Sequence, residues 1–271
     1  MKNASMRRVA VETALAKIEE ICDRKVASFG SDLESDYKLL PTGISSLDTL
    51  LGLTKPSVVR GKTLKYATTP VAGGIVKGGI TEIYGPESTG KTTLALQMIA
   101  AAQQRDELCC FVDLGRSFSK VEATKLGVDV DDLIVAAPMS IEEALKVIQT
   151  LLESDAIGLC VIDALGALQP HTVGNTMRGI PKSKASLITQ VIKNVDLLAA
   201  QSGTTCVITR RMNPTYSRPA AGDSAIHKAA KTTLELIRPT KDVPSYTLRL
   251  HKHVPANFYA GDGIDPKVMS I

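Results

Sequence analysis

The stretch that most constrains the fold of this chain runs Gly85-Pro86-Glu87-Ser88-Thr89-Gly90-Lys91-Thr92. It matches the phosphate-binding pattern G-x-x-x-x-G-K-[ST] at every fixed position. Two glycines give the loop backbone angles that a Cβ would forbid, so its N–H groups can turn toward phosphate oxygens. The Lys91 ammonium would reach the β- and γ-phosphates of ATP, and the Thr92 hydroxyl would ligate Mg²⁺. The predicted nucleotide-binding residues are Gly85, Pro86, Glu87, Ser88, Thr89, Gly90, Lys91, Thr92 and Thr93.

The segments on either side of this loop fit a phosphate site. Residues 79–84 are typical of a buried strand, and residues 93–102 are typical of a buried helix. Strand, glycine-rich loop and helix in this order are the context that the motif requires, and the helix start adds a partial positive charge. The alternative is a glycine-rich turn before an ordinary helix.

Apolar strands and helices alternate after the loop. Strands are predicted at 108–113, 133–136, 157–163 and 204–209, with helices at 141–154 and 184–201. Continuous apolar strands separated by helices indicate an α/β fold whose mostly parallel sheet is covered on both faces. Residues 232–236 and 246–250 alternate apolar and polar side chains, which predicts antiparallel outer strands.

Two of the predicted strands end in a carboxylate. Asp163 closes the run 157–163, and in nucleotidases of this kind such an aspartate holds Mg²⁺ directly or through water. Ligands of open α/β sheets bind beyond the carboxyl ends of the strands, where the phosphate loop would also lie. Asp113 is a second carboxylate at the same edge and a candidate catalytic group. The alternative for Asp163 is a residue that caps a turn.

Composition places the chain among ordinary globular proteins and excludes a membrane span. Of its 271 residues, 44% are apolar and 22% charged, and no apolar run approaches the roughly 18 residues of a spanning helix. The net charge of +4 is a weak indication of an acidic partner. Four of five cysteines lie in apolar runs without metal-ligand spacing, which predicts buried reduced thiols and a cytoplasmic location.

The chain divides by pattern into two parts. Residues 1–38 are predicted to form an N-terminal element, with an amphipathic helix from Val9 to Cys22, a short strand at 25–29 and a polar linker. The apolar stripe of this helix packs either on its own core or on a neighbouring subunit. Residues 39–271 form the main domain, in which 54–79 are predicted to be an inserted basic surface loop.

Several segments together resemble the RecA-type recombinases of bacteria. The phosphate loop with its Pro-Glu-Ser, the segment 42–48, the segment 125–129 and the run 161–168 are similar to that family in order and spacing. The resemblance covers about Val9 to Ile264. It implies a RecA-like P-loop ATPase core, a filament-forming homo-oligomer that binds ATP, Mg²⁺ and DNA, and an N-terminal element that links subunits.

The chain departs from this family at several functional positions. The glutamate that activates water in the family falls on Gly115, and the aromatic partner of adenine falls near Glu122. A glutamine that senses the γ-phosphate falls in the region Thr209 to Arg211. Two lysines that reach a neighbour's ATP fall on His251 and His253. Nucleotide binding is therefore expected, whereas fast hydrolysis is not.

The resemblance also places two DNA-facing loops at 171–184 and 210–223. Both contain glycine and basic residues and lack an acid before Asp223, which suits binding to the phosphates of single-stranded DNA. The alternative is a pair of solvated loops. The predicted DNA-binding residues are Arg178, Lys182, Lys184, Arg210, Arg211, Tyr216 and Arg218.

The resulting hypothesis is an ATP-binding RecA-like protein that oligomerises on DNA in homologous recombination or repair, with ATP as an assembly switch and weak hydrolysis. A second hypothesis is a non-catalytic scaffold of the same fold that recruits a DNA repair protein, such as a translesion polymerase. A third, a motor or helicase-like ATPase, is disfavoured because Gly115 stands where a catalytic glutamate is expected.

Overall fold

A computed structural model describes residues 2–23, 27, 38–52, 56–57, 65–66, 73–167, 184–212, 223–238, 247–253, 258–259 and 267–270. The chain forms two compact units, Met1–Tyr37 and Lys38–Ile271, which are considered separately below. Within the described residues, no helix combines the length and the apolar character needed to cross a membrane.

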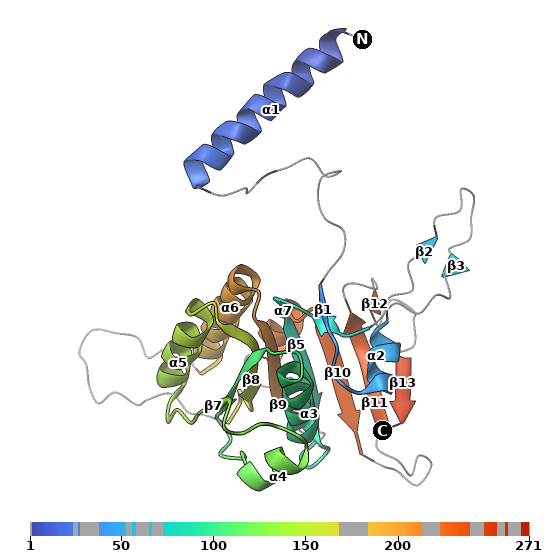
Figure 1. Cartoon of the computed structure of the whole chain (residues 1–271), viewed down its shortest axis with the longest axis vertical. Helices are drawn as coiled ribbons and strands as arrows, with labels where there is room; N and C mark the ends of the chain where they lie inside the picture. The colour runs from blue at the N-terminus through green and yellow to red at the C-terminus, as the bar shows by residue number, and fades with distance from the viewer. Residues whose placement is uncertain are drawn as a thin grey trace, which may run out of the picture. The chain divides into compact units, whose positions relative to one another are not determined.

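The first unit contains one long helix, α1 (Lys2–Cys22) (Figure 1). The helix predicted from Val9 therefore begins seven residues earlier. Val9, Val11, Ile18 and Ile21 are exposed on it, so the apolar stripe is not covered by the rest of the element. The strand predicted at 25–29 lies outside the described residues, except for Ala27.

The second unit is built on a central sheet. Six neighbouring strands are parallel, and β11 pairs with them in the antiparallel sense. The strands in spatial order are β12 (Phe258–Tyr259), β11 (Thr247–His253), β10 (Thr232–Ile237), β5 (Ile80–Gly85), β9 (Thr205–Arg211), β8 (Ile157–Asp163), β6 (Leu108–Asp113) and β7 (Leu133–Ala136), and β13 (Lys267–Ser270) also pairs with β11. The predicted α/β fold with a mostly parallel sheet is confirmed.

One prediction about the sheet is wrong. The strand at 232–236 was expected at the antiparallel edge, but β10 lies inside the sheet and runs parallel to β5, with Thr232 opposite Thr81. Only its other neighbour, β11, is antiparallel. Alternation of side chains arises here because Leu234 and Leu236 lie on one face of β10 and Thr233 and Glu235 on the other, so period two does not identify an outer strand.

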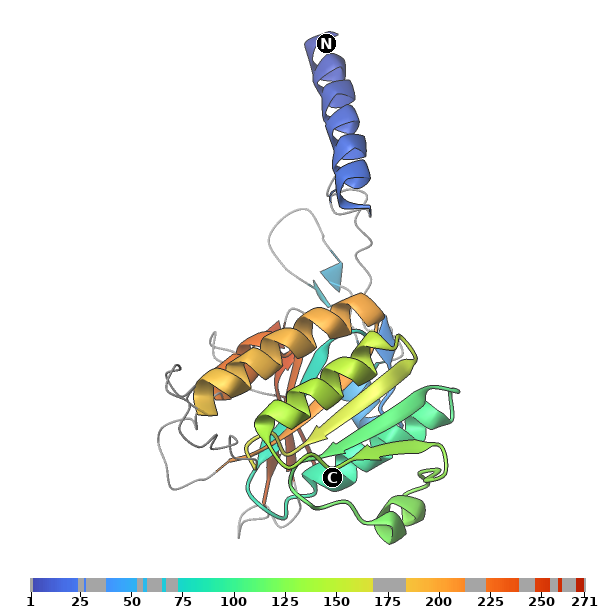
Figure 2. The same cartoon turned by 90° about the vertical axis from the view of Figure 1, so that its left-hand side faces the viewer.

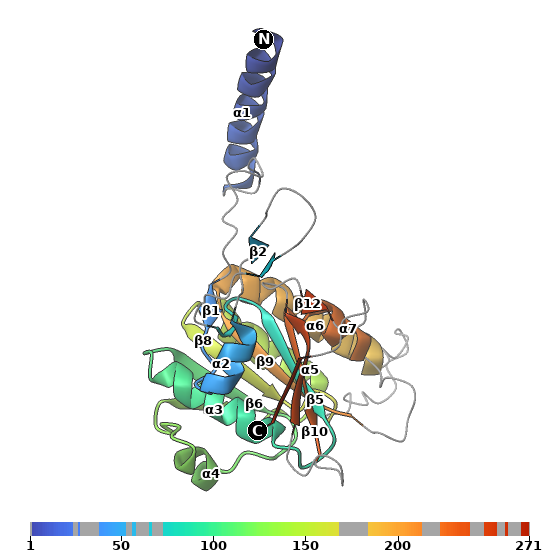
Figure 3. The same cartoon turned by 90° about the vertical axis from the view of Figure 1, so that its right-hand side faces the viewer.

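Helices cover both faces of the sheet. Helices α2 (Ser45–Leu51) and α3 (Lys91–Gln103) pack on one face (Figure 3), and α5 (Ile141–Glu153) and α6 (Lys184–Ser202) pack on the other (Figure 2). Successive strand residues contribute to opposite layers: Phe111 packs with the α3 layer and Val112 with the α5–α6 layer. This two-sided burial explains why the central strands are apolar along their whole length.

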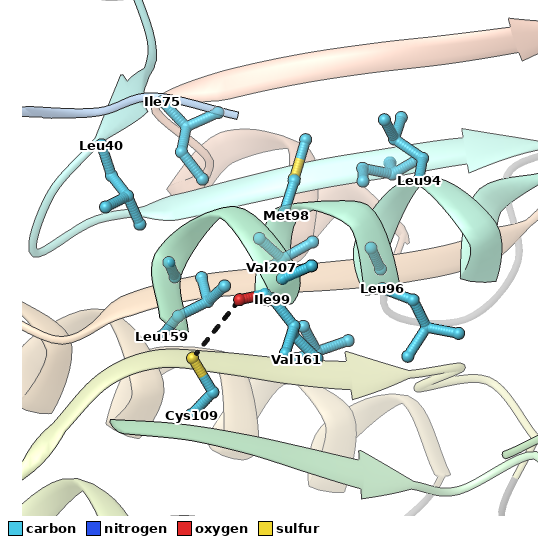
Figure 4. Packing of buried hydrophobic residues seen from close by; sticks show 14 of the residues in the cluster. Leu40, Ile75, Leu94, Leu96, Met98, Ile99, Cys109, Leu159, Val161 and Val207 are labelled. Atoms are coloured by element: carbon cyan, nitrogen blue, oxygen red, sulfur yellow. Dashed lines mark hydrogen bonds between the residues drawn. The ribbon is translucent and has the colours of Figure 1, made fainter. Parts of the chain in front are cut away.

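The interior beneath α3 is densely apolar. Ile99 of α3 lies close to Val161 and Val207 of the sheet (Figure 4), and Leu96 and Met98 belong to the same buried cluster. In the same layer the thiol of Cys109 donates to the carbonyl of Ile99, and burial raises the pKa of Cys109 to about 12.

On the other face, Cys110, Cys160 and Cys206 lie side by side on neighbouring strands. All four strand cysteines are free and buried, as predicted from the sequence. Burial raises the pKa of Cys109, and hydrogen bonding to a neighbouring thiol together with burial raises the pKa values of Cys110 and Cys160, so these three thiols stay protonated and unreactive.

The prediction of a surface loop at 54–79 is wrong for the last part of this segment. Ile75 and Val76 form β4 (Ile75–Val76), which pairs with β1 (Leu39–Leu40) and is buried. Gly73 lies so close to α2 that a Cβ there would stand 1.7 Å from the carbonyl oxygen of Asp48. Within the rest of this segment, the described residues form a two-strand pair, β2 (Pro56–Ser57) and β3 (Lys65–Tyr66).

Side-chain caps begin two of the helices. The Ser140 hydroxyl accepts from the N–H of Glu143 at the start of α5, and the Glu143 carboxylate accepts from the N–H of Met139. This reciprocal pair satisfies the N–H of Glu143, which the helix leaves without a partner, and the N–H of Met139 just before the cap. Ser119 caps α4 (Lys120–Lys125) in the same way, through the N–H of Glu122. The remaining helix, α7 (Asp223–Ala229), precedes β10.

Candidate nucleotide-binding site

The phosphate loop connects β5 to α3 and depends on its two glycines. Gly90 precedes α3 with a φ of 87°, in the left-handed region that favours glycine. A Cβ on Gly85 would lie 2.3 Å from the carbonyl oxygen of Leu236, so only glycine allows β5 and β10 to approach at this point. The helix start thus faces the space beyond the strand ends, as an anion site requires.

Lys91 is held against the backbone of the loop. Its Nζ donates to the carbonyl of Pro86 at 2.5 Å, and the Thr89 hydroxyl donates to the same carbonyl at 2.9 Å. Burial lowers the pKa of Lys91, and the nearby carboxylate of Asp163 opposes this shift. The ammonium therefore lies at the mouth of the loop, where a phosphate oxygen could replace a carbonyl as its acceptor.

Three hydroxyls converge on Asp163, the last residue of β8. Thr92 Oγ1 and Ser117 Oγ donate to Oδ2 at 2.7 and 3.1 Å, and Thr209 Oγ1 donates to Oδ1. The carboxylate is 4% exposed. Oxygen atoms of hydroxyl and carboxylate groups are the ligands that Mg²⁺ prefers, so this set fits the predicted metal. Sequence reasoning did not identify Ser117 as part of the site.

Asp113, at the end of the neighbouring strand β6, is held differently. It lies opposite Asp163 in the sheet, but its Oδ1 accepts from the N–H of Ser117 at 2.9 Å and its Oδ2 from the N–H of Phe118 at 3.0 Å. Both oxygens therefore fix the loop that follows β6. The catalytic role predicted for Asp113 stays a prediction, and its present contacts are those of a loop-stabilising residue.

A cavity of about 610 Å³ lies over these groups, a size typical of small-molecule sites. Lys91, Thr92, Ser117 and Asp163 line it, together with Gly115. The N–H of Gly115 donates to the Asp163 carbonyl at 3.1 Å. The position expected to carry a glutamate therefore faces the cavity, without a side chain.

Three of the residues predicted to bind DNA lie at the same cavity: Lys184, Arg210 and Arg211. The Lys184 ammonium donates to the carbonyl of Gly166 at 2.9 Å. Arg210 is largely buried, pairs with the fully buried carboxylate of Glu82 at 2.9 Å, and lies over the ring of Tyr84. DNA contact by Arg210 stays a prediction and would require these interactions to break. The residues that fall outside the described ranges are Arg178, Lys182, Tyr216 and Arg218.

The two histidines at the positions of the expected lysines have different environments. His251 Nε2 lies 2.7 Å from Glu235 Oε2 and its ring contacts that of Tyr84. The hydrogen bond from His251 lowers the pKa of Glu235, although burial of the carboxylate opposes the shift. His253 is fully buried, with Nδ1 2.9 Å from the Thr232 hydroxyl.

Comparison with known proteins gives the same assignment along most of the chain. Residues 9–214 match the model of the RecA N-terminal domain. The chain is 32% identical to protein RecA of Deinococcus radiodurans over 251 residues, which are 88% of this chain and 64% of that protein. It is 36% identical to protein RecA of Sinorhizobium fredii over 203 residues, or 73% of this chain and 50% of that protein.

The fold also matches a solved structure. The crystal structure of the RadB recombinase is similar with a TM-score of 0.58 at 20% identity, over 85% of this chain and 94% of that one. This likeness concerns the fold. The chain spans roughly half to two thirds of the length of the curated relatives that it matches.

Proposed function

The chain belongs to the RecA family, and from this premise we propose that it binds ATP with Mg²⁺ and oligomerises on DNA in homologous recombination or DNA repair. ATP acts as an assembly switch, and its hydrolysis is weak. The observation that carries the proposal is the convergence of Lys91, Thr92 and Asp163 at one cavity beyond the ends of β5 and β8.

Each of these groups has a distinct task in nucleotide binding. The backbone N–H groups of residues 86–91 and the start of α3 receive the phosphates, and Lys91 adds a full positive charge. Thr92 and Asp163 would hold Mg²⁺, with Ser117 and Thr209 orienting the carboxylate. When bound, the metal neutralises charge on the phosphate oxygens.

Weak hydrolysis follows from the groups that face the phosphate end of the cavity. Among the described residues that line it, the acidic ones are Glu87, on the phosphate loop, and Asp163, the proposed metal residue. Gly115 offers no base, and Asp113 is engaged by the N–H groups of Ser117 and Phe118. A positioned base typically contributes a factor of about 10² to 10⁴ to such a rate.

Assembly and DNA binding rest on separate features. The exposed apolar residues of α1 favour contact with a second copy of the chain in a filament. The basic residues of segments 171–184 and 210–223 favour single-stranded DNA, whose phosphates attract cationic side chains. A cytoplasmic location agrees with the free, buried cysteines.

The second candidate function is a non-catalytic scaffold that recruits a repair factor, such as a translesion polymerase. Gly115 favours it, because a scaffold needs nucleotide binding without turnover. Strand exchange by the purified protein would exclude this candidate, whereas DNA-bound filaments without exchange would favour it.

The test of the main proposal is sedimentation and electron microscopy of the protein with single-stranded DNA, with and without ATP and Mg²⁺. Wild type should assemble only with the nucleotide. Lys91→Ala should lose nucleotide binding and assembly while keeping its folded far-ultraviolet spectrum. Assembly by a folded Lys91→Ala protein at wild-type ATP concentrations would contradict ATP as the switch.

A further inference from the structure

The outer side of the phosphate loop is attached to the end of β10. The two strands approach closely where the loop begins, since a Cβ on Gly85 would stand 2.3 Å from the carbonyl oxygen of Leu236. Arg238, the residue that follows β10, then reaches the loop itself. Its Nε donates to the main-chain carbonyl of Glu87 at 3.1 Å, and its Nη2 donates to the same oxygen. Two donors of one rigid guanidinium therefore fix the direction of this carbonyl.

This contact does not involve the side chain of Glu87. The carboxylate of Glu87 pairs with a different arginine, Arg211, at 2.5 Å, and both of these side chains are exposed to water. An ion pair this exposed is weakly held. Because Arg238 binds the main chain, it can hold the loop whether or not the carboxylate changes its partner.

The direction of the Glu87 carbonyl decides where the next amide points. The carbonyl and the N–H of a trans peptide point in opposite directions, so the N–H of Ser88 points away from Arg238. Ser88 lines the cavity together with Lys91 and Thr92. Within the described residues, this N–H has no main-chain acceptor. It is therefore available to a ligand, and inward-pointing N–H groups are what a phosphate loop offers to phosphates.

Ser88 needs support from its neighbours because of its backbone conformation. Its φ of 59° lies in the left-handed region, where residues other than glycine are uncommon. Such conformations persist only where surrounding contacts enforce them. Lys91 and the Thr89 hydroxyl hold the Pro86 carbonyl from within the loop, and Lys91 would leave it to bind a phosphate. Arg238 holds the loop from outside and can stay in place when the site fills.

The charge of Arg238 also reaches the site. Burial is the main cause that lowers the pKa of Lys91, and the charges of Arg211 and Arg238 lower it further. Cations that repel one another around a phosphate loop are stabilised together by a polyanion bound between them. Arg238 thus favours an anion in the cavity by its charge as well as by its hydrogen bonds.

We propose that Arg238 is a positioning residue of the phosphate loop, which holds the Glu87 carbonyl outward so that the N–H of Ser88 faces the phosphates of the nucleotide. The proposal rests on the proposed nucleotide binding and adds the residue that sets the direction of one loop amide. The main-chain amides of such loops cradle the α- and β-phosphates, which ATP and ADP share. Arg238 therefore supports the binding of both nucleotides to the same extent.

The experiment measures the affinities of a non-hydrolysable ATP analogue and of ADP, both with Mg²⁺ and without DNA. For Arg238→Met we expect both affinities to fall by a similar factor of about ten, the low end of the scale for a hydrogen bond from a charged donor. Arg238→Lys, which keeps the charge and a donor, should recover part of the loss. The midpoint of denaturant unfolding should not change, because Arg238 is exposed.

A spectroscopic measurement follows the amide directly. In wild type, the amide resonance of Ser88 should shift when ADP and Mg²⁺ bind, because its N–H gains a phosphate acceptor. In Arg238→Met at saturating ADP the shift should be clearly smaller. An equal shift in both proteins would overturn the proposal, since the amide would then be directed without Arg238.

Arg105→Met is the matched control. Arg105 also donates to a main-chain carbonyl, that of Ala101, but it lies beyond the far end of α3. Its replacement should alter neither affinity. Salt distinguishes positioning from charge alone: at about 0.5 M salt, where exposed charges are strongly screened, the loss in Arg238→Met should persist. A loss that disappears at this salt concentration would overturn the positioning role.

Three further results have distinct meanings. A loss confined to the ATP analogue, or no loss for either nucleotide, would overturn the proposal. Unchanged nucleotide affinities with weaker binding to single-stranded DNA would do the same and would assign Arg238 to the DNA. If wild type binds no nucleotide, the proposed function itself fails. If wild type binds, Lys91→Ala does not, and Arg238→Met equals wild type, only this inference fails.

Discussion

Strands β6 and β8 lie side by side, and each ends in an aspartate at the edge that carries the phosphate loop. Asp163, on β8, accepts from hydroxyls of three side chains, of which Thr92 and Ser117 face the cavity. Asp113, on β6, accepts from two main-chain amides of the loop that follows it. Two aspartates at equivalent strand ends are therefore suited to different chemical roles.

The difference lies in what each carboxylate would lose by changing partners. Hydroxyls can rotate and accept as well as donate, so the contacts of Asp163 can be rearranged around a metal ion or its waters. The amides of Ser117 and Phe118 can only donate, and without them the buried carboxylate of Asp113 would lose its two main-chain partners, which is costly. Asp163 is thus suited to binding, whereas Asp113 is suited to holding the shape of the loop that contains Gly115.

The largest expected effect contrasts the two aspartates directly. Asp163→Asn should weaken Mg²⁺-dependent nucleotide binding by up to about 100-fold, since the charge opposite the metal is lost. Asp113→Asn should leave nucleotide affinity within about twofold and lower the free energy of unfolding by about 1–3 kcal/mol, because an amide N–H₂ cannot accept from a main-chain N–H. Nucleotide titrations with Mg²⁺ or with chelator, and denaturant unfolding, measure the two quantities.

Each variant is the control for the other. Loss of Mg²⁺-dependent binding in Asp113→Asn, with stability unchanged, would reverse the two assignments. Equal behaviour of both variants would mean that the difference in their hydrogen bonds has no functional consequence.

A second prediction concerns Gly115, in the loop after β6, where the resemblance to the family places a glutamate. Gly115→Glu should raise phosphate release in the presence of ATP, Mg²⁺ and single-stranded DNA by roughly tenfold or more, part of the range attributed to a positioned base. The loop has room for it, because a Cβ at this position would meet its nearest atom, the N of Ala164, at 3.7 Å. Gly115→Gln, equal in size but without a base, should leave the rate at the wild-type level.

The wild-type rate is itself informative. Turnover at or above about 1 s⁻¹, the low end of ordinary enzymes, would show that a base is already present. If Asp113→Asn abolished that turnover, Asp113 would be the base despite its two amide contacts, and the comparison with Asp163 would have to be redrawn.

Much of this arrangement was predictable because parallel strands end at one edge. The phosphate motif and Asp163 could be placed together from the sequence, since each stands at the carboxyl end of an apolar run typical of a parallel strand. The α/β fold followed from the same runs. The residues 73–76 were not recognised as buried, because glycines beside basic residues resemble a solvated loop until the close approach of α2 is known.

The missed site residues have a common physical cause. Ser117 and Thr209 reach Asp163 from two other segments, so no spacing in the sequence reveals the cluster. Arg210 was predicted to contact DNA because it belongs to a basic segment, and its buried partner Glu82 lies far away along the chain. The charge of a residue does not reveal where its side chain points. Its position on the strand decides whether the side chain faces solvent or a buried carboxylate.

The smallest expected effect tests whether the two carboxylates are coupled. Ser117 Oγ lies 3.1 Å from Asp163 Oδ2 and 3.4 Å from Asp113 Oδ1, and its single proton can serve only one carboxylate at a time. The shorter contact favours Asp163. Ser117→Ala should therefore weaken Mg²⁺-dependent nucleotide binding about two- to fivefold, the scale of one net hydrogen bond, without a large change in stability.

Ser117→Thr is the matched control, because it keeps the hydroxyl and should retain the affinity. A large loss of stability in Ser117→Ala with unchanged Mg²⁺ dependence would mean that the hydroxyl serves Asp113. In that case Thr92 and Thr209 alone would supply the hydroxyls that hold Asp163. The loop after β6 would then depend on the Ser117 side chain as well as on the amides of Ser117 and Phe118.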